Sequence, residues 1–133
     1  MKQIEKRDLE HFMQYMTQHG MKKNNLSARW NDEEMKEGVR NKLELLPEHV
    51  TEEIQIVEVG AFYALRIHEK LTRSKNSALI ALWLVLAFFR INGFEVRTSN
   101  HELLMAALII EKKGFTEGKL SDWFAAKISV RAL

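Results

Sequence analysis

The sequence predicts an all-α protein. One proline and six glycines interrupt its 133 residues, which is typical of a helical chain with short connections. Apolar residues recur at three- and four-residue spacing along most of the chain, as they do on the buried face of a helix. The stretch from Asn76 to Phe89 has no formal charge and would be apolar on every side of a helix. We therefore expect a helical bundle around a buried central helix at about residues 76–92.

The composition fits a single domain over residues 1–133. With 20 basic and 18 acidic side chains the net charge is only +2, so we expect no binding to nucleic acid or membranes driven by overall charge. The absence of cysteine excludes disulfides, thiol catalysis and cysteine-ligated metal sites. The apolar stretch is shorter than the about 20 residues that span a membrane. Because the N-terminus is charged and lacks the apolar core of a signal peptide, we expect a cytoplasmic protein.

Two helices are expected before Pro47. The first runs from about residue 8 to residue 19, and its buried face carries Leu9, Phe12, Met13 and Met16. A polar loop covers residues 21–30. Asn31 and Glu34 have the pattern of a capping box, which predicts a second helix from there to about residue 45.

A third helix is expected to begin after Thr51 and to reach Leu71. Its inward residues are predicted to be Ile54, Val57, Phe62, Leu65 and Ile67. After the central helix, the pair Asn92-Gly93 reads as a C-terminal cap, and residues 94–96 as a short extended exit.

Two helices are expected after this exit. Ser99 and Glu102 form a capping box that opens a helix ending near Gly114, with an apolar set Leu103, Leu104, Ala107, Leu108 and Ile110. The last helix should span about Thr116 to Val130, with Leu120, Trp123, Phe124 and Ile128 as core residues. A short β-hairpin in the loops is compatible with this pattern.

The order of these helices, with Tyr63 before the apolar helix and the segment Phe89 to Val96 closing it, resembles the Fic and death-on-curing (Doc) family, whose fold is called Fido. The resemblance covers nearly the whole chain, and the chain length is similar to that of the death-on-curing branch. It implies a Fido-like helical bundle. It also implies a link to toxin–antitoxin systems of bacteria or their phages.

The activity of that family rests on a loop of the form His-x-Phe-x-Asp-[Gly/Ala]-Asn-[Lys/Gly]-Arg before the core helix, and this motif is missing here. Aligned without gaps, Leu71 takes the histidine position and Lys75 the acidic position. Leucine cannot accept a proton, and lysine cannot hold a magnesium ion. In a register shifted by three residues, His68 takes the histidine position and Thr72 the acidic position. Both registers remain open, as does the reading of His68 as an ordinary surface histidine.

The start of the central helix is a candidate anion- or nucleotide-binding site, because a helix N-terminus presents unpaired N–H groups and the positive end of the helix dipole. The side chains that could add donors are Arg73, Ser74, Lys75, Asn76 and Ser77. The alternative is that Ser74, Asn76 or Ser77 caps the helix and that the two cations are solvated.

Three cations, Arg66, Lys70 and Arg73, lie at positions i, i+4 and i+7 and share one helical face. They could contact an acidic protein partner, or they could simply be solvated. Since aromatic residues do not alternate with them, nucleic acid is not an expected partner. The five histidines share no metal-ligand spacing, so no metal site is expected.

The sequence thus leaves three functions open. The first is a catalytically degenerate Fic/Doc-like domain that binds or regulates a protein, such as an antitoxin-like partner, without a cofactor. The second is a transferase that uses ATP and Mg²⁺ to adenylylate or phosphorylate a protein hydroxyl, with His68 as a catalytic residue in an altered loop. The third is an unrelated helical module that forms homodimers.

Overall fold

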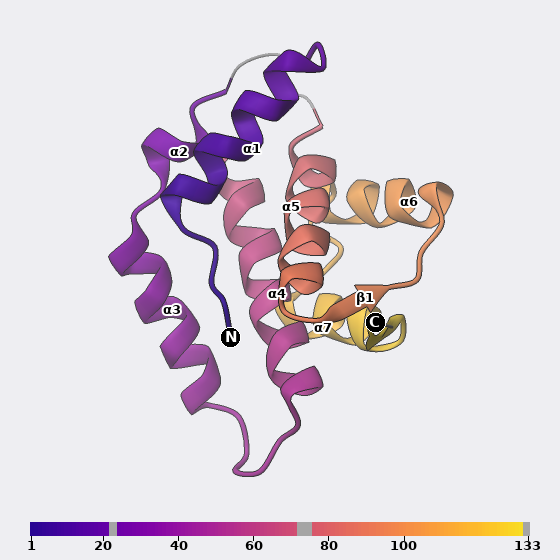
Figure 1. Ribbon diagram of the computed structural model, residues 1–133. Helices are drawn as coiled ribbons and strands as arrows, with labels where there is room; N and C mark the ends of the chain where they lie inside the picture. The colour runs from indigo at the N-terminus through magenta and orange to yellow at the C-terminus, as the bar shows by residue number, and fades with distance from the viewer. Residues whose placement is uncertain (22–23, 72–75, 132–133) are drawn as a thin grey trace.

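The computed structural model describes residues 1–21, 24–71 and 76–131, and it confirms the all-α prediction (Figure 1). The described part of the chain contains seven helices and one two-stranded sheet. The elements are α1 (Lys6–Gln18), α2 (Leu26–Arg29), α3 (Asp32–Glu44), α4 (Glu52–Lys70), α5 (Ser77–Ile91), β1 (Phe94–Val96), α6 (Asn100–Glu111), α7 (Glu117–Ala125) and β2 (Ile128–Val130). Of the described helices, none has the length and apolarity needed to cross a membrane.

The starts of four helices follow from their capping residues. The side-chain oxygens of Asn31, Thr51, Ser99 and Thr116 each accept a hydrogen bond from the backbone N–H three residues later. At α6 the side chain of Glu102 also accepts from the backbone N–H of Ser99, which confirms the predicted capping box. The helix α2 was not expected, because it lies inside the loop predicted for residues 21–30.

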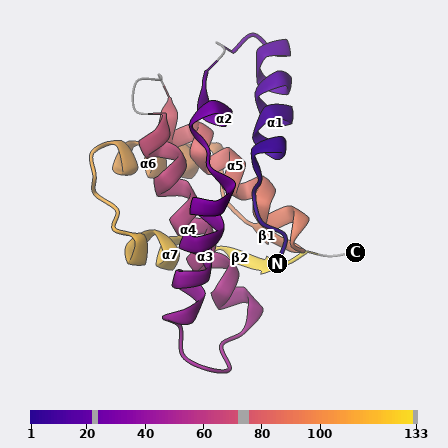
Figure 2. The same ribbon diagram turned by 90° about the vertical axis from the view of Figure 1, so that its left-hand side faces the viewer.

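The helix α4 forms the centre of the packing. It contacts α5 and α7 most extensively and also packs against α2 and α3. Figure 1 shows α3, α4, α5 and α6 in that order from left to right, and in the turned view α3 stands in front of α4 (Figure 2). The predicted central helix, α5, shares the central position with α4.

Glycine in α4 allows this close packing with α5. A Cβ atom at Gly60 would overlap the ring of Phe89, which is fully buried. That ring packs edge-on against Phe124 of α7, with centroids 5.0 Å apart, so it has little room to move. The backbone of α4 at Gly60 thus forms part of the surface on which α5 lies.

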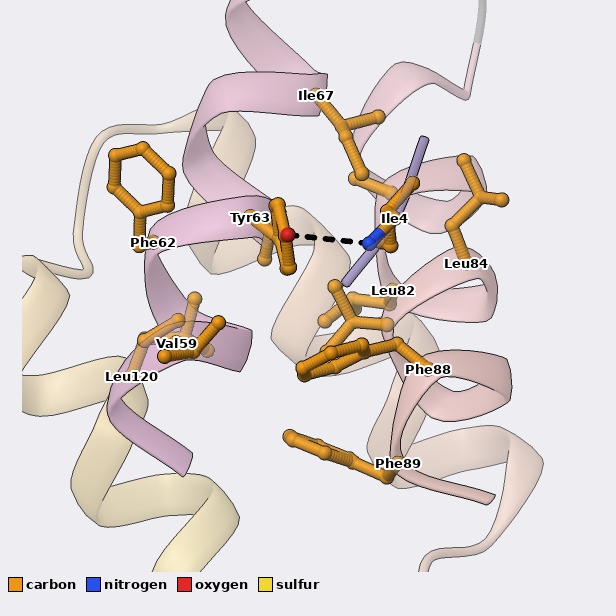
Figure 3. Close-up of a cluster of buried hydrophobic side chains, with 14 of the residues drawn as sticks. Ile4, Val59, Phe62, Tyr63, Ile67, Leu82, Leu84, Phe88, Phe89 and Leu120 are labelled. Atoms are coloured by element: carbon orange, nitrogen blue, oxygen red, sulfur yellow. Dashed lines mark hydrogen bonds between the residues drawn. The ribbon is translucent and has the colours of Figure 1, made fainter. Parts of the chain in front are cut away.

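Tyr63 joins the N-terminal segment to the core (Figure 3). Its ring is fully buried and packs edge-on against Phe88, with centroids 5.1 Å apart. The backbone N–H of Ile4 donates a hydrogen bond of 3.2 Å to the Tyr63 hydroxyl oxygen. Burial raises the pKa of Tyr63 well above its usual range, because the phenolate would lose its hydration. The hydroxyl therefore remains a neutral anchor for Ile4.

The C-terminal end departs from the prediction. The helix α7 ends at Ala125, and Ile128–Val130 forms β2, so a helix to Val130 is wrong. The strand pairs antiparallel with β1, with Phe94 opposite Val130. The strands do not form a hairpin, because α6 and α7 lie between them in the sequence. The β-branched residues Ile128 and Val130 favour the extended backbone.

The prediction of inward residues is only partly correct. In α4, Val57, Phe62 and Ile67 are buried, but Ile54 is exposed because the buried part of this helix begins at Ile56. In α6, Leu103, Ala107 and Ile110 are buried, whereas Leu104 and Leu108 are exposed. The spacing of apolar residues predicts that a helix has a buried face, but it does not indicate which sides of the helix have a neighbour.

We expect Gly60→Ala to lower the free energy of unfolding by about 1–3 kcal/mol, because the added methyl group forces the confined Phe89 ring to shift. This cost should exceed the roughly 0.5–1 kcal/mol that alanine gains over glycine inside a helix. The matched control is Gly118→Ala in α7, where the nearest atom to an added Cβ lies 4.0 Å away. Urea unfolding followed by circular dichroism measures both variants, and equal stabilities would contradict this account of the α4–α5 contact.

Candidate functional site

The end of α4 and the start of α5 meet at a histidine–serine pair. His68 is half-buried in the last turn of α4, and its Nδ1 lies 2.9 Å from Oγ of Ser77, the first residue of α5. Ser77 is only 4% exposed. The structure therefore brings together two of the residues that the sequence singled out for different reasons.

A histidine can activate a neighbouring hydroxyl as a general base when a third group orients the ring. Within the described residues, no carboxylate is hydrogen-bonded to His68, and the near-complete burial of Ser77 leaves little room for a substrate at its oxygen. The pair is well placed to fasten α4 to α5. Across residues 1–21, 24–71 and 76–131, no three His, Asp or Glu side chains are grouped so as to hold a metal ion.

The predicted anion site at the start of α5 is only partly described. Arg73, Ser74 and Lys75 lie outside the described residues, and their role stays a prediction. Asn76 has a left-handed backbone, with φ of 63°, and its side chain makes no capping hydrogen bond to α5. Asparagine adopts this conformation more readily than most residues. Asn76 thus shapes the turn into α5 through its backbone.

The predicted stripe of three cations is not a row of equivalent charges. The Nη1 atom of Arg66 lies 3.0 Å from Oε1 of Glu69, and its guanidinium lies over the Phe62 ring, 5.3 Å from the centroid. The backbone carbonyl of Lys70 accepts a hydrogen bond from Arg29 of α2. Arg73 lies outside the described residues. Arg66 is therefore engaged on its own helix, which reduces its availability to a partner.

A different surface on α5 and α6 is the most unusual feature of the molecule. Trp83 and Ile91 on the outer side of α5 are 38% and 53% exposed, and Leu104 and Leu108 of α6 are both 50% exposed. We use the term apolar face for six residues: Leu79, Trp83, Ala87 and Ile91 of α5, and Leu104 and Leu108 of α6. The prediction that other helices surround α5 on every side is wrong for this face.

Two grooves border the outer side of α5. One lies between the start of α5 and α6 and is lined by Asn76, Leu79, Leu104, Ala107, Leu108 and Glu111. The other lies between α5 and the N-terminal segment with α1, and it is lined by the charged residues Lys2 and Asp8 as well as by apolar residues that include Ile4, Phe12 and Ile91. The apolar face is therefore bordered by two hollows, one beside Leu79 and the other beside Ile91.

Sequence reasoning missed this surface, although the sequence contains a signal for it. The run from Leu103 to Ile110 has eight apolar residues and no charge, so α6 is apolar on every side, as α5 is. A chain of this length has few helices with which to cover two such elements. An apolar helix near the edge of the bundle must then leave some of its side chains in contact with solvent or with another protein.

No protein-family model, curated protein or solved structure matches this chain. The resemblance to the Fic/Doc family accordingly remains a proposal.

We expect His68 and Ser77 to be coupled in stability. A double-mutant cycle with His68→Ala and Ser77→Ala should give a coupling energy of about 0.5–1.5 kcal/mol, because the two side chains share one hydrogen bond between helices. Chemical unfolding of the four proteins measures it. The control cycle combines Ser77→Ala with His101→Ala, because His101 is exposed on α6. In this cycle the two changes in the free energy of unfolding should simply add. A coupling no larger than in the control cycle would show that the bond does not fasten the helices.

Proposed function

We propose that this chain is a catalytically degenerate Fic/Doc-like domain that acts by protein binding or regulation, and that the apolar face is its binding surface. The observation that supports this proposal is the exposure of large apolar side chains on adjacent turns of α5 and α6. Contiguous apolar patches on soluble proteins mark interaction sites far more often than scattered single residues do. A tryptophan at the centre of such a patch is typical of residues that dominate binding energy.

The arrangement of charge agrees with a protein interface. The apolar face itself has no charged member, whereas four charged residues lie at its borders: Lys2, Asp8, Arg90 and Glu111. Protein interfaces have this organisation, with an apolar centre that excludes water and a polar rim that remains hydrated. A small-molecule or nucleic-acid site would instead require convergent polar or basic groups.

The inner sides of α5 and α6 form part of the core. Phe88 and Phe89 bury the inner side of α5, and Leu103 and Ile110 bury the inner side of α6. Leu79 packs partly against this core, whereas Trp83, Ile91, Leu104 and Leu108 are exposed and would favour aggregation if they remained uncovered. Their apolar character is best explained by a partner that covers them.

The altered loop supports binding rather than catalysis. Leu71, which takes the histidine position in the ungapped comparison with the family, is almost fully buried and packs in the hydrophobic core. A leucine side chain has no group that can accept or donate a proton. We propose that the chain acts in the cytoplasm and, as the resemblance implies, in a toxin–antitoxin or phage-related setting, with an antitoxin-like protein as a class of partner.

Photo-crosslinking tests this proposal directly. With p-benzoylphenylalanine in place of Trp83, we expect irradiation of the producing cells to give a cross-linked product that disappears in the Leu104→Asp/Leu108→Asp background, because these charges disrupt the apolar face. The same probe in place of Lys36, exposed on α3, is the matched control and should give less product. Equal cross-linking at positions 83 and 36, or a product unaffected by the two aspartates, would contradict the proposal.

A second candidate function is the ATP-dependent transferase, favoured by the His68–Ser77 pair at the start of α5. Calorimetric titration with ATP and Mg²⁺ separates the two functions. For a binding domain we expect no heat at millimolar nucleotide in the wild type. Micromolar binding that is lost in Arg73→Ala/Lys75→Ala or in His68→Ala would contradict a catalytically degenerate domain.

A further inference from the structure

We infer that the apolar face is covered by a second copy of this chain, with the α5 helices of the two copies antiparallel. This inference rests on the proposed function and names the partner of that same surface. In a two-fold interface the same patch meets itself, so the patch must be complementary to its own rotated image. The spacing of residues along α5 and the positions of Arg90 and Glu111 agree with this condition.

The positions of three residues on α5 are compatible with a two-fold axis that passes near Trp83. Asn76, Trp83 and Arg90 lie seven residues apart, which is close to two helical turns, so they lie along one line of the helix surface. All three are exposed. Trp83 is the midpoint of this line, and an antiparallel pairing centred on it brings the Trp83 side chains of the two copies together. The same pairing places Leu79 of one copy opposite the smaller Ala87 of the other, which allows the helices to approach closely.

The charges at the two ends of this line are opposite in sign. Arg90 is exposed at the C-terminal end of α5, and Glu111 borders the groove at the N-terminal end beside Asn76. Neither forms an ion pair with another described residue. Antiparallel pairing about Trp83 carries Arg90 of each copy to the end of the face where Glu111 of the other copy lies. Two symmetric ion pairs then flank an apolar centre.

This complementarity favours a second copy over an unrelated protein. Arg90 and Glu111 lie near opposite ends of α5, and the rotation that superposes Trp83 on itself brings Arg90 of each copy toward Glu111 of the other. Rim ion pairs add little affinity but exclude other registers, because a wrong register places like charges together. The register of the dimer is thus determined by the same helix that provides its apolar centre.

Charge reversal tests the inference. In sedimentation velocity the purified wild-type chain should form a dimer. We expect Arg90→Glu and Glu111→Arg each to raise the dimer dissociation constant by about tenfold or more, since each places like charges at both ends of the interface. The double variant Arg90→Glu/Glu111→Arg should restore the dissociation constant to within about threefold of wild type, because the pairs reform with opposite polarity. Circular dichroism shows that each variant is folded.

A wild-type chain that stays monomeric, or a dimer whose dissociation constant is unchanged by the single reversals, would overturn the inference. So would single reversals that the double variant does not rescue. The cross-linking experiment distinguishes failure of the second-copy inference from failure of the proposed function. A monomeric chain whose residue 83 cross-links to a different protein overturns the second copy and leaves the proposed function standing, whereas a monomeric chain without such a product overturns both.

Discussion

The contact between α4 and α5 determines how the rest of the chain is arranged. At Gly60 the backbone of α4 lies directly against the ring of Phe89, and that ring in turn packs on Phe124 of α7. One close approach therefore joins three helices. The N-terminal segment is attached to the same pair of helices, through the Tyr63 hydroxyl in α4 and through Asn92, whose side chain forms two hydrogen bonds with the backbone of Lys2.

This packing also explains the exposed surface. Because α5 turns Phe88 and Phe89 toward α4 and the core, its opposite side depends on other elements for cover. The helix α6 lies beside α5 but leaves Trp83 exposed. An apolar helix with neighbours on only part of its circumference gains the rest of its burial by association. The function that we propose is thus a consequence of how few helices surround α5.

Much of this fold could be predicted from the sequence, because capping residues and apolar periodicity act locally. Ser99 with Glu102 and Thr51 marked helix starts to within a residue. The pairing of Phe94 with Val130 could not be predicted in this way, since it joins residues far apart in the chain. Nor could the exposure of Leu104, because periodicity describes one helix and exposure depends on its neighbours.

The same distinction between local and long-range contacts applies to the candidate sites. His68 and Ser77 were recognised separately, but their hydrogen bond depends on the angle at which α4 meets α5, which local patterns do not contain. The ion pair between Arg66 and Glu69 joins residues one turn apart in the same helix, so it could have been predicted from their i,i+3 spacing. The apolar face required knowledge of which helix sides have neighbours, and only the tertiary structure supplies that.

The solvent exposure of Trp83 tests the central claim most directly. In a folded Trp30→Phe/Trp123→Phe variant, Trp83 is the remaining tryptophan of the three in the chain, and its quenching by acrylamide can be followed over a series of protein concentrations. If the apolar face is covered by a second copy, quenching should weaken and the emission should shift to shorter wavelength as concentration rises. Adding Glu111→Arg should move both changes to higher concentration. A Trp83 that stays equally exposed at every concentration would contradict the account.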